Sequence, residues 1–63
     1  KRGFVMGRLI YILIGKRKSQ IMYLKVYSTR QQAETQREIL ERYDRDTKDY
    51  DWTYQILEER VWD

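Results

Sequence analysis

Six consecutive apolar residues, Leu9 to Ile14, constrain the fold more than any other part of this 63-residue chain. The run is too short for a helix and is rich in β-branched side chains, so it predicts a strand. Because every position is apolar, both faces of this strand need a cover, which places it in the middle of a sheet. Gly15 to Gln20 then predicts a polar turn, and Ile21 to Tyr27 predicts a second strand that completes a hairpin over residues 8–27.

A helix is predicted over residues 29–43, with Thr29 as its N-cap and Gln32 completing a capping box. The charged stretch 44–51 either prolongs this helix or forms a solvated connection. Alternating apolar residues predict a third strand over residues 52–58, and the last five residues either continue this strand or fold back.

These elements predict one small α+β domain in the order β-β-α-β. A right-handed crossover through the helix places the third strand beside the first, antiparallel to it, so the predicted sheet order is 2-1-3. Residues 1–7 are predicted to be a flexible arm. A chain of this length lies near the lower limit for independent folding, so self-association is expected to add stability.

One helix covers only one face of such a sheet. The other face is expected to carry alternate residues of the first strand beside three residues of the second. The first-strand set is either Leu9, Tyr11 and Leu13 or Ile10, Ile12 and Ile14, and the second-strand set is Ile21, Tyr23 and Tyr27. Three covers remain open: the arm together with Val61 and Trp62, a second copy in a homodimer, or a different partner. Tyr11, Tyr23, Tyr27 and Trp62 are the candidate sheet-face or interface residues.

The charges of the chain are divided between its halves. Residues 1–30 carry eight basic and no acidic side chains, whereas residues 31–63 carry five basic and ten acidic ones. The candidate contact to nucleic acid or to an acidic partner is the predicted hairpin tip, extended by two further cations. Its residues are Lys16, Arg17, Lys18, Lys25 and Arg8. The alternative is that these charges only solvate the turn.

The sequence contains few residues of the types that usually act in catalysis or bind metal ions. There is no cysteine and no histidine, which excludes disulfides, an ordinary zinc site and the common nucleophile–base pairs. The aspartates of residues 44–51 lack the bend glycine and the closing glutamate of a calcium loop. We therefore expect no enzyme, no metal site and no cofactor.

The longest apolar run has six residues, far below the roughly 20 that a membrane span needs. The charges that flank this run also argue against a signal peptide. Together with the absence of cysteine, these features predict a cytoplasmic protein without a membrane segment.

The segment Val26–Glu34, VYSTRQQAE, resembles the strand-to-helix junction of many small proteins of phages and other mobile elements. The layout of the chain is also similar to small phage inhibitors of host RNA polymerase of the T7 type, which combine a hairpin, a helix and a final strand. The resemblance covers topology over most of the chain, but the hairpin here is basic whereas that inhibitor is acidic.

Basic strands that run into a Thr-capped helix are also similar to the arm-binding domains of tyrosine recombinases and to AP2-like domains, which read DNA with the sheet. Here two strands precede the helix instead of three, and a further strand follows it. The sequence therefore favours a non-enzymatic binding protein of phage or mobile-element type that acts on a host machine. The alternatives are a nucleic-acid binder that uses the hairpin tip and a structural subunit of a larger assembly.

Overall fold

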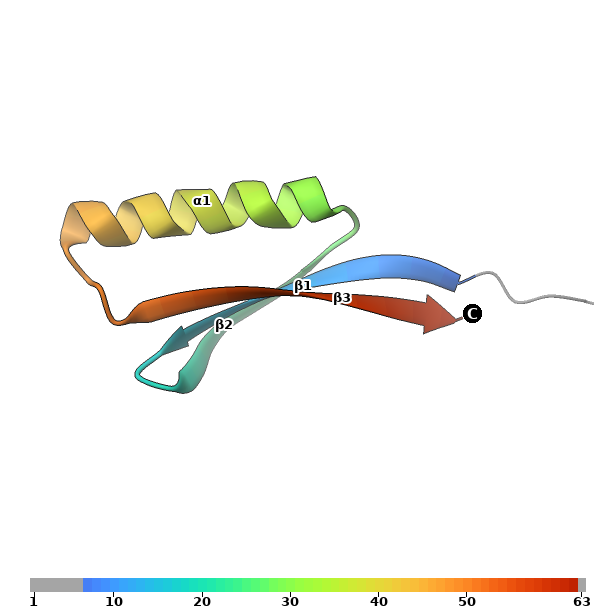
Figure 1. The fold of residues 1–63 in the computed structure, drawn as a ribbon, viewed down its shortest axis with the longest axis horizontal. Helices are drawn as coiled ribbons and strands as arrows, with labels where there is room; N and C mark the ends of the chain where they lie inside the picture. The colour runs from blue at the N-terminus through green and yellow to red at the C-terminus, as the bar shows by residue number, and fades with distance from the viewer. Residues whose placement is uncertain (1–6, 63) are drawn as a thin grey trace, which may run out of the picture.

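The computed structural model describes residues 7–62 and shows a three-stranded sheet with one helix lying across it (Figure 1). In chain order the elements are β1 (Gly7–Arg17), β2 (Gln20–Tyr27), α1 (Arg30–Thr47) and β3 (Trp52–Trp62). β1 lies between β2 and β3 and is antiparallel to both. The predicted α+β fold with sheet order 2-1-3 is confirmed. Of the predicted arm, only Gly7 belongs to the described residues, and it begins β1.

The core is small and is built on β1. Leu13 is fully buried, and Ile14 beside it is only 9% exposed. On α1 the one buried residue is Ala33, whose small side chain lets the helix come close to the sheet. A core of this size gives only a few kcal/mol of net stability, so a single contact contributes a large share of the free energy of unfolding.

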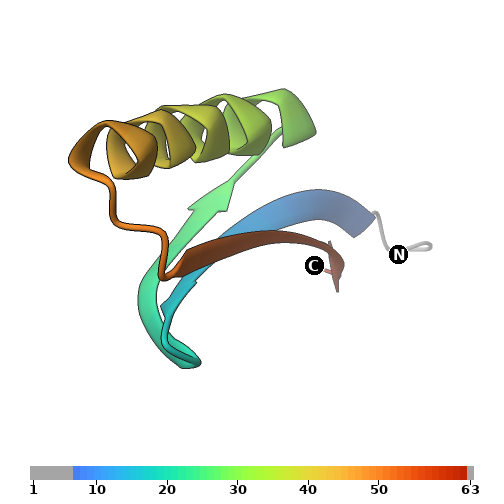
Figure 2. The same ribbon diagram turned by 60° about the vertical axis from the view of Figure 1, so that its left-hand side comes forward.

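Strand alternation gives β1 two different faces. Odd-numbered residues face α1: the ring of Tyr11 lies under the guanidinium of Arg30, and Gly15 pairs with Tyr54, which bonds to the helix. Even-numbered residues therefore lie on the opposite face. Figures 1 and 2 show α1 on one side of the sheet only, with no described segment on the other.

A β-bulge in the hairpin changes which residues of β2 share a face. Ile14 pairs with Leu24 and Gly15 with Tyr23, but Lys16 pairs with Ile21, which leaves Met22 without a partner on β1. The extra residue exchanges Ile21 and Met22 relative to strict alternation. The prediction that Tyr23 and Tyr27 share the uncovered face with Ile21 is therefore wrong, because both tyrosines lie on the helix side.

The hairpin turn is tighter than predicted. Gly15 and the two residues after it belong to β1, and only Lys18 and Ser19 connect the strands. Both have positive φ, 54° and 71°, as a two-residue turn of type I′ requires. Such turns usually contain asparagine and glycine, so the dipeptide Lys18-Ser19 does not predict one from the sequence.

Thr29 caps α1 as predicted, since its hydroxyl accepts a hydrogen bond from the Gln32 amide at 3.2 Å. The hydroxyl of Ser28 donates to the Gln32 side-chain oxygen at 3.2 Å, so Gln32 bonds to Ser28 rather than closing the predicted capping box on the Thr29 backbone amide. The helix ends at Thr47, four residues later than residue 43, so half of the charged connection is helical.

Lys48 ends the helix in the left-handed conformation, at φ 59° and ψ 33°. The Lys48 amide donates to the carbonyl of Arg45, and the Asp49 amide donates to that of Asp44 at 2.8 Å. This is the Schellman pattern, with lysine where glycine is usual.

β3 continues to Trp62 rather than ending at residue 58, and it pairs with β1 along its whole length. Trp62 lies opposite Gly7, at the end of the sheet far from the hairpin tip. Within residues 7–62, no helix has the length and apolar character that a membrane crossing requires.

Candidate functional site

The structure separates the five cations that were predicted to form one contact. Arg8 and Lys16 lie on the uncovered face, eight residues apart along β1, which is roughly 26 Å of extended strand. Lys25 lies on the helix side, with its ammonium group 5.7 Å from the centre of the Tyr27 ring. Lys18 is exposed in the turn.

Arg17 forms ion pairs with acidic residues of the loop after α1. Its Nε atom lies 3.3 Å from Asp49 and its terminal nitrogen 3.9 Å from Asp51. Of the three tip cations, only Lys16 and Lys18 therefore make no ion pair with another described residue. A continuous track of phosphate contacts is not formed by this arrangement.

All four aromatic residues predicted for the sheet face lie on the helix side. The hydroxyl groups of Tyr23 and Tyr27 are 3.3 Å apart. Burial, followed by the interaction with Tyr23, raises the pKa of Tyr27 to about 12. Tyr11 and Trp62 lie under the guanidinium groups of Arg30 and Arg60, at 5.3 and 5.5 Å.

The uncovered face is instead aliphatic. The register of the three strands brings together eight side chains on this face, which we call the open face: Ile10, Ile12, Ile14, Ile21, Leu24, Val26, Leu57 and Val61. Leu24 and Val26 on the outer strand β2 are 60% and 50% exposed. Of the charged residues on this face, Arg8 and Lys16 lie at its two ends and Glu59 lies on β3.

A second cluster forms on the helix side, where the end of α1 meets β3 and the hairpin tip. The Tyr54 hydroxyl donates to Asp44 at 2.6 Å, and the Trp52 indole N–H donates to Asp49 at 3.1 Å. Asp49 also receives Arg17. These five residues, which we call the aspartate clasp, join α1, β1 and β3 through side chains.

Within the clasp, Tyr54 is hard to ionise. Burial is the largest cause that raises the pKa of the Tyr54 phenol, followed by its hydrogen bond to Asp44 and by the negative charges of Asp44, Glu41 and Asp49. The ring is therefore held neutral in a negative electrostatic environment.

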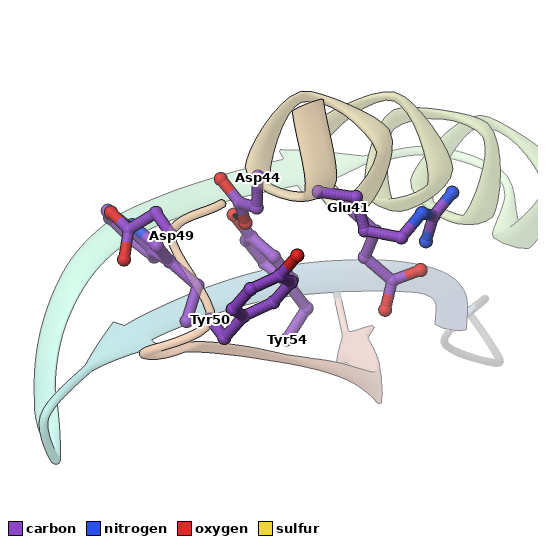
Figure 3. Close-up of a pocket in the computed structure, with 7 residues that line it drawn as sticks. Glu41, Asp44, Asp49, Tyr50 and Tyr54 are labelled. Carbon is purple, nitrogen blue, oxygen red and sulfur yellow. Dashed lines mark hydrogen bonds between the residues drawn. The ribbon is translucent and has the colours of Figure 1, made fainter. Parts of the chain in front are cut away.

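Next to the clasp lies a pocket of about 220 Å³ that is open to solvent, here called the aromatic pocket. Its lining combines carboxylates, rings and one guanidinium: Glu41, Asp44, Arg45, Asp49, Tyr50, Trp52 and Tyr54. The acidic side chains come from α1 and the loop after it, and Tyr50 and Tyr54 lie below them beside β3 (Figure 3). The rings of Trp52 and Tyr54 are nearly parallel, at 5° and 5.9 Å between centres.

Neither the clasp nor the pocket is evident in the amino-acid sequence. The spacing of the aspartates in residues 44–51 suits no metal loop and therefore predicts only a solvated connection. Arg17 and Asp49 are separated by 32 positions, so only the sheet register brings them together. Within the described part of the chain, no group of three acidic side chains is placed to hold a metal ion.

Comparison of the chain with protein-family models, with curated proteins and with solved structures found no match.

Proposed function

We propose that this chain is a non-enzymatic, cytoplasmic binding protein of phage or mobile-element type that modulates a host macromolecular machine through protein–protein contact. The observation that carries the proposal is the open face, where eight aliphatic side chains of three strands adjoin one another and no other element of residues 7–62 lies over them; all of them except Ile14, which is 9% exposed, are at least partly open to solvent. Contiguous apolar patches of this kind mark interaction sites on small proteins. The partner is expected to offer an apolar surface with charged groups at its rim that complement Arg8, Lys16 and Glu59.

The open face suits a protein better than a nucleic acid. Its side chains are aliphatic, whereas single-stranded nucleic acids stack on aromatic rings and follow tracks of cations. The tyrosines that would serve as such rings lie on the helix side, and the candidate cations are dispersed over both faces.

The test is capture from a nuclease-treated host lysate with three immobilised chains: the original chain, the variant Leu24→Lys/Leu57→Lys and the control Ile39→Lys. Leu24 and Leu57 are exposed on the outer strands of the open face, and Ile39 is 55% exposed on α1. A protein captured by the original chain and the control, but not by the double variant, would support the proposal. Equal capture by all three, or capture that is seen only in a parallel lysate without nuclease, would refute it. Circular dichroism checks that each variant is folded.

We also propose that the free chain forms a homodimer through the open face, because two such faces can pack as a sheet sandwich about 10 Å apart. Sedimentation equilibrium should then give the mass of two chains for the original and of one chain for Leu24→Lys/Leu57→Lys. Since dimer and host partner compete for one surface, added free chain should reduce capture. An original chain that stays monomeric at all concentrations contradicts the dimer but leaves the capture test intact.

The second candidate function is nucleic-acid binding. It is favoured by Lys18, which is exposed at the tip of the hairpin and makes no ion pair within residues 7–62. Charge reversal at Lys16 and Lys18 tests this function without disturbing the pairing of Arg17. Affinity for duplex or single-stranded DNA that falls with salt and is lost in this variant would favour it. Unchanged binding in the variant would exclude the tip as the contact.

A further inference from the structure

We propose that the aromatic pocket binds an organic cation, a guanidinium or methylated ammonium group, over the rings of Tyr50, Trp52 and Tyr54 and beside the carboxylates of Glu41 and Asp44. The pocket lies on the helix side of the sheet, so this inference is independent of the open face and of the function proposed for it.

The rings of Trp52 and Tyr54 form a platform that is fixed before any ligand arrives. Asp44 holds the Tyr54 hydroxyl at 2.6 Å and Asp49 holds the Trp52 indole at 3.1 Å, with the two ring planes within 5° of each other. Cations bind to the faces of such rings, and tryptophan and tyrosine are the preferred partners. A platform that needs no ordering loses less affinity on binding.

The charge of the lining is also suited to a cation. Three carboxylates line the pocket against one guanidinium, that of Arg45. Arg17 pairs with Asp49, but Glu41 and Asp44 make no ion pair among residues 7–62. The raised pKa of Tyr54, to which these carboxylates contribute, agrees with a negative potential at the ring.

The same fold already contains a contact of this type. The guanidinium of Arg30 lies 5.3 Å from the centre of the Tyr11 ring and bonds to the Glu58 carboxylate at 3.4 Å. A ring with a neighbouring carboxylate thus holds a guanidinium of the chain itself. In the aromatic pocket the rings and carboxylates are present, and the volume of about 220 Å³ equals that of roughly seven liquid waters, enough for a small cationic head group.

Titration of the isotope-labelled protein with choline chloride and with methylguanidinium chloride tests the proposal by NMR. The Trp52 indole N–H signal should shift saturably with a dissociation constant on the order of 1–10 mM. Sodium chloride at equal ionic strength and the neutral choline analogue 3,3-dimethylbutan-1-ol serve as controls. A saturable response to methylguanidinium alone assigns the pocket to arginine side chains, and one to choline alone assigns it to methylated ammonium groups.

Matched variants locate the binding. Glu41→Gln with Tyr50→Ala should weaken cation binding roughly 10-fold, because it removes one carboxylate and one ring. Tyr50 is 73% exposed, so this change leaves the core alone. Glu38→Gln removes the same charge one turn earlier on α1, outside this pocket, and should bind as the original does. The proposal is overturned if neither cation gives a saturable shift, if the neutral analogue binds equally well, or if the double variant binds like the original.

Discussion

Substitution of Gly15 by alanine tests whether the aspartate clasp really fixes the Tyr54 ring. Gly15 has no positive φ, so alanine meets no backbone strain and would by itself stabilise the strand by about 0.4–1 kcal/mol. A Cβ atom at this position, however, would lie 2.9 Å from Cε1 of Tyr54 and 3.1 Å from Cβ of Tyr23. One of these neighbours therefore has to move.

The size of the expected change in the free energy of unfolding follows from the interactions that hold the Tyr54 ring. Tyr54 is tied to Asp44 at 2.6 Å, and a hydrogen bond to a charged group is worth about 1.5–3 kcal/mol. Overpacking a fitted site costs typically 1–3 kcal/mol. After the backbone gain is subtracted, Gly15→Ala should lower the free energy of unfolding by about 1–2 kcal/mol, a large share of the total for so small a core.

Urea denaturation followed by tryptophan fluorescence measures this change, and a double-mutant cycle with Tyr54→Val isolates its cause. Without the ring, Gly15→Ala should become neutral or stabilising, so the sign of the effect reverses. Gly7→Ala is the matched control. Its Cβ would also come within 2.9 Å of a ring, but this ring belongs to Trp62, which is 62% exposed and can turn into solvent. Additive effects of Gly15→Ala and Tyr54→Val would refute the reasoning.

Three further predictions concern the turns and the pH dependence of stability. Lys48→Gly should raise the free energy of unfolding by about 1 kcal/mol, since a non-glycine residue is strained at φ 59°, and thermal unfolding measures the gain. Lys18→Asn with Ser19→Gly should stabilise the hairpin by a similar amount, about 1 kcal/mol, and an unchanged or lower melting temperature would contradict the type I′ turn. Stability should be full below the usual tyrosine pKa near 10 and fall as pH rises toward 12, because folding raises the pKa of Tyr27 and Tyr54 and the unfolded chain loses these protons first. Urea titrations at pH 8 and 11 check this, and Tyr54→Phe should reduce the loss.

The topology could be predicted because it depends on averaged properties of long segments. The apolar run Leu9 to Ile14 is the one stretch that is apolar on both faces, and only a central strand accounts for this. The Thr29 N-cap could also be predicted, because its hydrogen bond joins residues three positions apart and because only a few residue types, threonine among them, form such caps.

The ends of the helix and strands could not be predicted as well, because residue types that rarely occupy such positions form them. Lys48 occupies a left-handed position that glycine normally marks, so α1 gave no stop signal before residue 47. Lys18 and Ser19 form a turn without asparagine or glycine, and Gly15 pointed to a turn although it lies inside β1. At Gly15 the missing side chain serves close packing with Tyr54 rather than backbone freedom.

The bulge at Met22 shows why the candidate surfaces could not be assigned from alternation alone. One unpaired residue moves Ile21 to the open face and keeps Tyr23 on the helix side, where Tyr23 and Leu40 line an apolar cleft. The two faces of the sheet thereby become chemically distinct. The open face is aliphatic, whereas the helix side gathers the rings and the carboxylates around Tyr54. The two proposed binding sites thus lie on opposite faces of one sheet and can be tested separately.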